Sequence, residues 1–136
     1  MSKGVRIEVH AEGFESVFTE LARLEDPAWE PLLRIMGATI QEQTVNHFTM
    51  QAGPSGSWPP TQRGGAALIK TGTLRGSIQT VVGTDEVEIG TNIEYAKYHQ
   101  LGTKRIPQRA FLGLTDTDQN ELQRVIENYV ANIVGE

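Results

Sequence analysis

The segment from Tyr95 to Leu114 of this 136-residue chain brings together several side chains that could carry out chemistry. An imidazole in this segment could act as a general base or bind a metal, and aromatic rings interleaved with cations could stack bases and neutralise phosphates. The sequence therefore raises three possibilities, namely a catalytic site, a metal site and a nucleic-acid-binding site. The aromatic, imidazole and basic residues concerned are Tyr95, Lys97, Tyr98, His99, Lys104, Arg105, Arg109 and Phe111.

Neither a metal site nor a catalytic site is supported by the spacing of the residues. No pair among His10, His47 and His99 has the i, i+4 spacing of helical metal ligands. The chain has no Cys, which excludes a disulfide, a thiolate zinc site and a thiol nucleophile. His99 could be combined with Ser77 and Asp85 as a triad, but no nucleophile elbow surrounds Ser77. We expect no catalytic residue, metal or cofactor, and a structural His99 whose ring bonds a backbone carbonyl.

The distribution of charge along the chain indicates which kinds of partner the protein could bind. The net charge of -5 argues against a protein that coats nucleic acid in general. Residues 61–109 hold seven Lys and Arg against four Asp and Glu, whereas residues 1–60 hold four against eight and residues 110–136 hold one against five. A mixed surface of this kind is ordinarily just solvated, but it also allows head-to-tail contact between a basic middle and acidic flanks. Nucleic-acid binding through the basic 97–109 segment stays as the alternative function.

The first half of the chain must provide a strand and helices that position this segment. Val5, Ile7 and Val9 alternate with polar residues, which predicts a half-buried strand. Residues 14–24 have apolar side chains at helical spacing, and Asp26-Pro27 can begin a long helix that runs to about His47. Gly37 either weakens that helix or permits close packing. The expected apolar stripe is Leu33, Met36, Ile40, Thr44 and Phe48, widened by Leu32, Ile35 and Thr39.

A Gly- and Pro-rich stretch follows this helix. From Met50 to about Lys70 neither a helical nor a strand period is present, so we expect a long loop over about residues 50–70. Trp58 precedes two prolines in it, and a loop of this length with an exposed Trp suggests a docking loop. The alternative is that Trp58 packs onto its own domain.

Shorter elements fill the second half. Residues 78–82 and 86–90 are rich in β-formers and flank a Gly-containing turn, which predicts a hairpin with Val87 and Ile89 on the buried face. Residues 95–101 should form a short helix or turn that Gly102 ends, and residues 103–107 should be extended before Pro107. A terminal helix capped by Thr115 or Asp116 carries a stripe at i, i+3, i+4 spacing. Its apolar members are Leu122, Val125, Ile126, Tyr129, Val130, Ile133 and Val134.

These elements predict an α+β fold in one domain, residues 1–136. It should consist of a small antiparallel sheet packed by a long helix and a C-terminal helix, with the long Gly/Pro-rich loop outside them. No run of residues approaches the length of a membrane span, and no secretory signal is visible at the start. We therefore expect a protein that is made and used in cytoplasm, with no membrane partner.

Four blocks of the sequence, in this order, resemble the phage virion morphogenesis proteins, the tail-completion family of Mu-like and P2-like tailed phages. The blocks are Leu68–Ile78, Val87–Thr91, Tyr95–Gly102 and Ile106–Leu114, and the preceding Gly53–Pro60 stretch is also similar. They cover about the central third of the chain. The order of the blocks is more specific than any one of them, whereas the N-terminal part and the last helix match only in general character.

The resemblance implies a structural protein of the tail or neck of the virion, assembled in the host cytoplasm. It implies a homo-oligomeric ring at the head-tail joint, with a hexamer as one candidate, and as partners the other neck, connector or tail-tube proteins. DNA would be met only by passage through the lumen. It implies no catalytic residue and no cofactor. Residue types and resemblance together give the expected interface residues Trp58, Tyr95, Tyr98, His99, Lys104, Arg105, Arg109 and Phe111, and Arg109 could bond a carboxylate inside the subunit or across its boundary.

Overall fold

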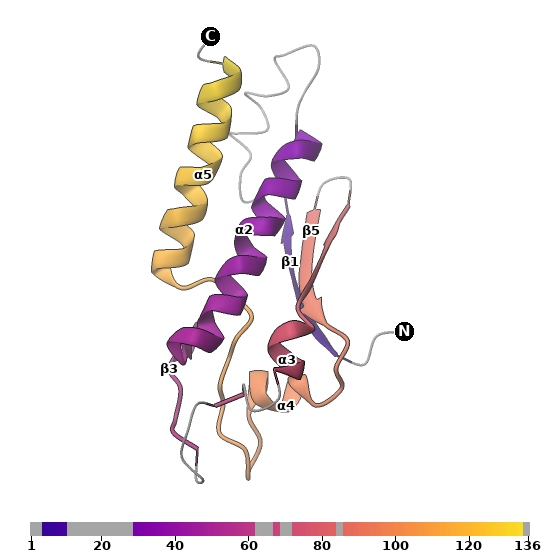
Figure 1. The fold of residues 1–136 in the computed structure, drawn as a ribbon, viewed down its shortest axis with the longest axis vertical. Coiled ribbons are helices and arrows are strands. Elements are labelled where there is room, and N and C mark those ends of the chain that lie inside the picture. Colours follow the sequence, from indigo (N-terminus) through magenta and orange to yellow (C-terminus); the bar gives the residue numbers. More distant parts are fainter. Residues whose placement is uncertain (1–3, 11–28, 62–66, 69–71, 84–85, 135–136) are drawn as a thin grey trace.

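The computed structural model describes residues 4–10, 29–61, 67–68, 72–83 and 86–134. A three-stranded antiparallel sheet, a long helix and a C-terminal helix form the body of the molecule, which confirms the predicted α+β class (Figure 1). The sheet has the order β1-β5-β4, so β5 is central. The strands are β1 (Val5–His10), β4 (Gln79–Val82) and β5 (Glu86–Thr91). The two long helices are α2 (Trp29–Met50) and α5 (Asp116–Val134).

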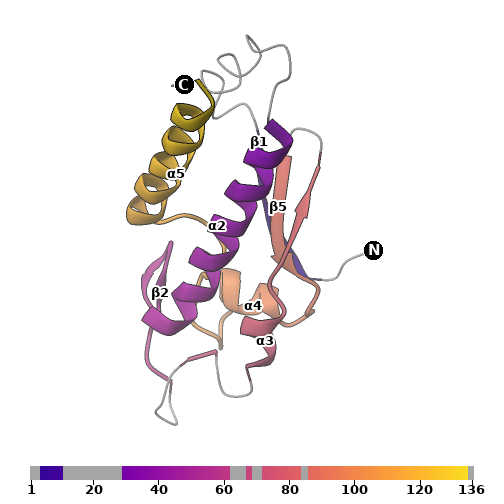
Figure 2. The ribbon, with the colours of Figure 1, turned by 45° about the horizontal axis from the view of Figure 1, so that its top comes forward.

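Smaller elements gather around the C-terminal end of α2. They are the two-residue strands β2 (Ala52–Gly53) and β3 (Gly56–Ser57), and the short helices α3 (Thr73–Gly76) and α4 (Ala96–Leu101). In both ribbon views α4 lies on the side of α2 that faces away from α5 (Figures 1 and 2). Helix α2 therefore has α4 on one side and α5 on the other.

The predicted hairpin is confirmed as β4 and β5. Thr80 pairs with Ile89 and Val82 with Val87, which puts these side chains on one face of the sheet. Val87 and Ile89 are fully buried on that face, against which α2 packs. The strand predicted for residues 5–9 is also confirmed, because β1 completes the sheet on the other side of β5.

Helix α2 lies between the sheet and α5, so it is buried on two sides. Ile35, expected in the apolar stripe, is 37% exposed, whereas Gln43 and His47 are buried although polar. Because a sheet covers α2 on one side and α5 covers it on the other, its buried residues extend beyond a single apolar stripe. The buried residues of α2 are Leu32, Leu33, Met36, Gly37, Ile40, Gln43, Thr44, His47 and Phe48.

Gly37 marks the place where α2 comes closest to the sheet. A Cβ atom built on Gly37 would lie 2.7 Å from Thr80 Cγ2 and 2.9 Å from Val87 Cγ1, closer than real side-chain carbons approach. Of the two roles expected for this glycine, the structure therefore supports close packing.

The remaining predictions for the helices have mixed outcomes. Helix α2 continues to Met50, beyond the expected end at about His47. The terminal helix starts as predicted, because the Thr115 hydroxyl accepts a hydrogen bond from Asp118 N (3.0 Å) and the Asp118 carboxylate accepts one from Thr115 N (3.1 Å). This reciprocal pair is a capping box. The helix expected over 14–24 and the start proposed at Asp26-Pro27 lie outside the described residues.

The expectation of a docking loop carrying an exposed Trp58 is corrected. The first part of the stretch turns back on itself as the β2–β3 hairpin, and Trp58 after it is only 7% exposed. Its ring packs edge-on against Phe48 with centroids 5.5 Å apart, and its Nε1 donates to Ala110 O at 3.1 Å. The alternative, in which Trp58 packs onto its own domain, is the one observed.

We predict that Trp58→Ala destabilises the chain by about 3–5 kcal/mol, because it removes a large buried ring and leaves a cavity. Trp58→Phe should lose less, on the order of 1–3 kcal/mol, because mainly the hydrogen bond to Ala110 O is lost. Urea unfolding of purified protein measures both. Tyr98→Ala, which truncates an exposed aromatic ring, is the matched control, and a Trp58→Ala midpoint equal to the control midpoint would contradict the core assignment.

Candidate functional site

An apolar stripe is exposed on α4. Tyr95, Tyr98 and Leu101 are spaced three residues apart and are 44%, 41% and 71% exposed, whereas Ala96 beneath them is fully buried. Residues at this spacing lie on one side of a helix. We call this stripe, together with Lys104 and Arg105, the α4 surface.

The aromatic rings of the α4 surface have neighbours that restrict their motion. The Lys97 ammonium lies over the Tyr98 ring, 5.4 Å from its centroid. The Tyr95 ring meets the His99 ring edge-to-face with centroids 6.1 Å apart. Such cation-π and edge-to-face contacts hold a ring in place while one side stays open to a partner.

A closed turn follows α4 and presents the two cations. Gly102 ends the helix with φ 78°, a conformation that side chains rarely adopt, and its N–H donates to Tyr98 O at 2.8 Å. Thr103 N then donates to Ile106 O at 2.8 Å, and the Thr103 hydroxyl accepts from Ile106 N at 2.9 Å. The extended conformation predicted for residues 103–107 is therefore wrong, since the chain closes a loop before Pro107. Lys104 and Arg105 are exposed in this turn.

Gln100 ties α4 to the segment behind it. Its Oε1 accepts hydrogen bonds from Phe111 N and Leu112 N, both at 3.0 Å, and its Nε2 donates to Leu112 O at 3.0 Å. One amide side chain thus satisfies three backbone groups as a neighbouring strand would. Sequence reasoning missed Gln100, because an amide in a short helix has no pattern that distinguishes it.

Other elements hold the same segment, residues 109–112, which we call the central segment. Ser55 Oγ accepts from Ala110 N at 3.3 Å, and Ala110 O accepts from Trp58 as described above. His47 Nδ1 bonds Phe111 O at 2.7 Å. The central segment belongs to no helix or strand, so side chains from α2, the β2–β3 region and α4 supply its hydrogen bonds.

The structure separates the eight expected interface residues into two groups. Tyr95, Tyr98, His99, Lys104 and Arg105 lie together on or beside the α4 surface. Trp58, Arg109 and Phe111 are 7%, 7% and 0% exposed, so their side chains pack inside this subunit, and their contact with a neighbour stays a prediction. Leu101, the most exposed large apolar residue of the stripe, was not among the eight.

Among the described residues, the Arg109 side chain bonds backbone carbonyl groups and not the carboxylate that we expected. Its Nε donates to Pro59 O at 2.9 Å and its Nη2 donates to Pro60 O at 3.1 Å. The guanidinium therefore fixes the chain that follows Trp58. Two carbonyl dipoles solvate the charge, which also acts on the neighbouring His99.

His99 is half-buried next to this charge. Burial and the Arg109 guanidinium lower the pKa of His99 below its ordinary value of 6.5. Its Nδ1 is buried and has no hydrogen-bond partner among the described residues, so the ring–carbonyl bond that we expected does not involve this nitrogen. The Ser77 hydroxyl donates to Leu74 O at 2.6 Å and bonds the Thr91 hydroxyl at 2.6 Å, and Asp85, the third member of the imagined triad, lies outside the described residues.

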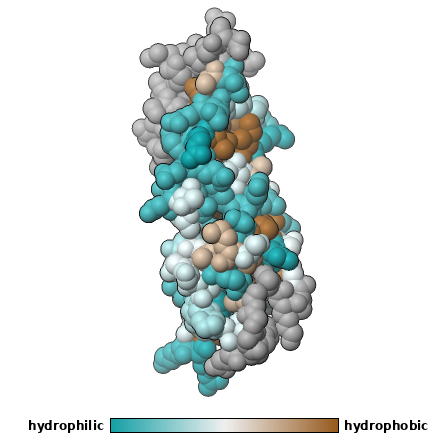
Figure 3. Space-filling model, turned by 60° about the vertical axis from the view of Figure 1, so that its left-hand side comes forward, coloured by the Kyte–Doolittle hydropathy of each residue, from teal (hydrophilic) through white to brown (hydrophobic). Residues whose placement is uncertain are grey.

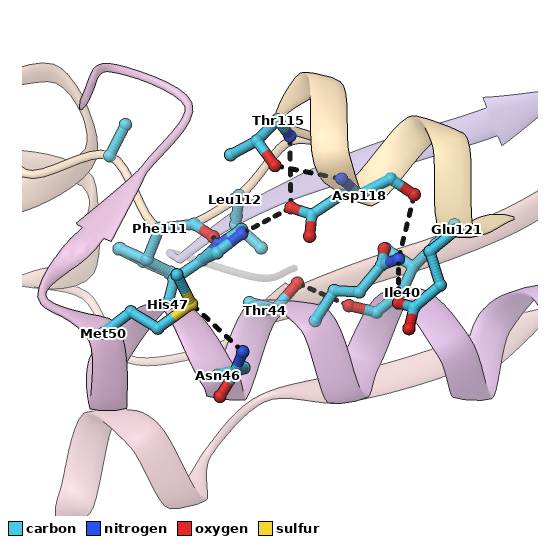
Figure 4. A network of polar contacts seen from close by, with 12 residues as sticks. Ile40, Thr44, Asn46, His47, Met50, Phe111, Leu112, Thr115, Asp118 and Glu121 are labelled. Carbon is cyan, nitrogen blue, oxygen red and sulfur yellow. Dashed lines mark hydrogen bonds and ion pairs between the residues drawn. The ribbon is translucent and has the colours of Figure 1, made fainter. Parts of the chain in front are cut away.

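A second polar cluster lies between α2 and the start of α5 (Figure 4). His47 Nε2 lies 2.7 Å from Asp118 Oδ2, while Nδ1 faces Phe111 O. The two ring nitrogens of His47 thus join the start of α5 to the backbone of the central segment. Gln43 Nε2 donates to Asp118 O at 3.0 Å and to Glu121 Oε1 at 2.7 Å.

This cluster forms one side of a groove of about 760 Å³ between α2, β2 and the first turns of α5. The charged groups that line it are Glu42, Asp118, Glu121 and Arg124, together with His47. The face of the molecule on the α5 side is mostly hydrophilic (Figure 3). We call this hollow the α2–α5 groove, and sequence reasoning did not predict it.

The structure adds two further observations on the site. Within the described part of the chain, no group of three or more His, Asp or Glu side chains could hold a metal ion. None of the helices described is both long and apolar enough to span a bilayer. What the described residues present is thus an exposed aromatic and basic surface on one side and a polar groove on the other.

Comparison with known proteins identifies the class of protein to which this arrangement belongs. Residues 9–131 match the phage virion morphogenesis family, and the chain belongs to that family. Two relatives come from Haemophilus influenzae. Mu-like prophage FluMu G protein 2 is 29% identical over 90% of this chain and 95% of the relative, and Mu-like prophage FluMu G protein 1 is 25% identical over 88% and 90%. No solved structure matches significantly.

Family and relatives together give a role in phage virion assembly. The family confirms the resemblance inferred from the four blocks, and its match extends well beyond them on both sides. Neither the family description nor the names of the relatives refer to a chemical reaction.

We predict that His99 makes the folded chain less stable in acid. Because the pKa of His99 is lower in the folded chain than in the unfolded chain, the unfolded chain binds more protons below pH 6.5. The free energy of unfolding should therefore be highest above pH 6.5 and fall as the pH drops toward the folded pKa. His99→Gln should flatten this part of the profile, measured by urea unfolding from pH 8 to 5. The other histidines are present in both chains, so identical slopes would contradict the prediction.

We also predict that Asp118→Ala lowers the free energy of unfolding by about 2–4 kcal/mol. The substitution removes the cap of α5 and leaves the buried His47 ring without its acidic partner. Asp116→Ala, which removes an exposed carboxylate from the same first turn, is the control. We expect Asp118→Ala to unfold at a lower urea concentration than Asp116→Ala. Equal midpoints would show that the His47 contact contributes nothing to stability.

Proposed function

We propose that this chain is a non-enzymatic tail-completion or neck subunit that forms a ring at the head-tail joint of a tailed phage. Membership of the virion morphogenesis family over residues 9–131 is the observation that carries the proposal. Its partners would be copies of itself and other neck, connector or tail-tube proteins. DNA would only pass through the lumen, and the protein would be assembled in the host cytoplasm into the virion tail or neck.

The α4 surface supports a function based on binding. Tyr95, Tyr98 and Leu101 form an exposed apolar stripe, and stripes of this kind with a polar rim are typical of protein contact sites. The side chains rest on a backbone that Gln100 and the turn at 103–106 already hold in place. Little conformational freedom would therefore be lost on binding.

Catalysis is less well supported by the same residues. His99 and Ser77 have separate surroundings, and the Arg109 guanidinium is engaged with two carbonyl oxygens. Two of the residues that looked reactive in the sequence, Ser77 and Arg109, therefore hold backbone in place.

Nucleic-acid binding through residues 97–109 remains the second candidate. One observation favours it, namely that Lys97, Lys104 and Arg105 lie near the exposed Tyr98 ring. One observation weakens it, because the fourth cation, Arg109, is buried. Salt-sensitive binding of DNA that Lys104→Glu with Arg105→Glu abolishes would favour this candidate over the ring.

Deletion of the gene from the phage or prophage that encodes the chain tests the proposed function. We expect infectious particles to be lost, with heads and tails accumulating separately in electron micrographs, because the joint would be incomplete. A wild-type copy supplied in trans should restore joined particles, and the protein should be found in them.

Two results would overturn this proposal. Normal infectious particles from the deleted phage would exclude an essential place at the joint. Joined particles without the protein, made while a wild-type copy is present, would exclude a permanent neck subunit.

A further inference from the structure

We propose that the turn carrying Lys104 and Arg105 of one subunit docks into the α2–α5 groove of the next copy of the same chain. This inference rests on the proposed function, since it supplies the contact by which the ring would close. The turn is the donor surface of this contact, and the groove, which carries the opposite charge, is the acceptor surface.

The donor is a projecting turn with cations in it. Lys104 and Arg105 are exposed, and the hydrogen bonds of Thr103 fix the backbone beneath them. Tyr98 and Ile106 lie beside them in a shallow apolar hollow. The turn can therefore enter a concave site without first being ordered.

The acceptor is concave and bears more negative than positive charge. Glu42, Asp118 and Glu121 line the α2–α5 groove, with Arg124 as the cation that lines it and the His47 ring beside Asp118. Asp118 already interacts with His47, which leaves Glu42 and Glu121 exposed for an incoming cation. Glu121 also accepts a hydrogen bond from Gln43 at 2.7 Å, so its position is fixed.

A second feature of the groove is the amide of Gln43. Its Nε2 must face Asp118 O and Glu121 Oε1, because both are acceptors, and this fixes the orientation of the amide. Its Oε1 is then buried with no donor among the described residues. A buried acceptor without a partner is destabilising, and a donor brought in from another subunit, directly or through water, would relieve this.

Charge complementarity favours a second copy as the occupant. The donor residues lie in the basic middle of the chain, and the acceptor residues lie in the acidic parts before and after it. One molecule therefore carries both halves of the contact. Opposite charges at this spacing would set the register of the contact, whereas like charges would cost several kcal/mol.

The positions of the two surfaces allow this contact between molecules but not within one. The α4 surface lies on the side of α2 that faces away from α5, and the groove lies on the α5 side (Figures 1 and 2). Different patches that meet head to tail make a heterologous interface, and such an interface closes into a ring when the rotation permits.

A charge-swap experiment in the full-length chain tests the pairing. The first variant is Lys104→Glu with Arg105→Glu, and the second is Glu42→Lys with Glu121→Lys. Each is supplied alone, and then both together, to a phage that lacks the gene. Infectious particles are counted, and the oligomeric state of the purified chains is measured by native mass spectrometry.

We expect each variant alone to lower the yield of infectious particles by on the order of 100-fold or more, since every contact would bring like charges together. The two variants together should restore the yield to within about tenfold of wild type, because each acidic turn can then enter a basic groove and each basic turn an acidic groove. A chain with all four substitutions should assemble with itself.

Folding is checked separately, because Glu121→Lys removes the hydrogen bond from Gln43. Circular dichroism and urea unfolding are recorded for each variant. Glu42→Lys with Asn120→Lys is the replacement if the second variant unfolds, since both residues are exposed in the groove and neither substitution removes the Gln43–Glu121 hydrogen bond.

The other outcomes overturn the pairing. If either variant alone supports normal particles, the charges are not needed, whereas the ring itself stands. If both variants fail alone and together although both are folded, the two surfaces do not meet each other. If the phage lacking the gene forms normal particles, the proposed function fails and the pairing fails with it.

Discussion

The central segment, residues 109–112, places the strongest constraint on this structure. It is buried and irregular, so its backbone groups cannot be left without partners and have no strand beside them. Gln100, Ser55, Trp58 and His47 supply the missing hydrogen bonds. These four residues come from three separate regions, and satisfying one short stretch of backbone therefore fixes the positions of α4, the β2–β3 region and α2 relative to one another.

This constraint explains which parts of the fold the sequence predicts. The hairpin, β1 and the capped terminal helix follow from local patterns, because Val87 and Ile89 alternate with polar residues and Thr115 stands three residues before Asp118. The burial of Trp58, Arg109 and Phe111 depends on bonds between side chains and distant backbone, which no periodicity reveals. The same residues that looked like interface anchors in the sequence therefore belong to the core.

The candidate site shows the same division. Clustering of Tyr95, Tyr98, Lys104 and Arg105 along the sequence was enough to predict a surface, since α4 and one turn hold them all. The groove could not be predicted in this way, because Glu42 and Glu121 are far apart in the chain and meet only when α5 packs against α2. His47 and Asp118 likewise become a pair only through that packing.

The partners of the central segment also bear on when the chain can fold during its synthesis. His47 emerges from the ribosome long before Phe111 and Asp118, with which it interacts, and Trp58 emerges long before Ala110, whose carbonyl accepts its hydrogen bond. Contacts so distant in sequence close late, after the entropy of a long loop has been lost. The sheet and α2 can pack before these contacts form, whereas the α2–α5 groove cannot exist before α5 has been made. A new subunit would therefore become competent for a contact through this groove only after α5 has been synthesised.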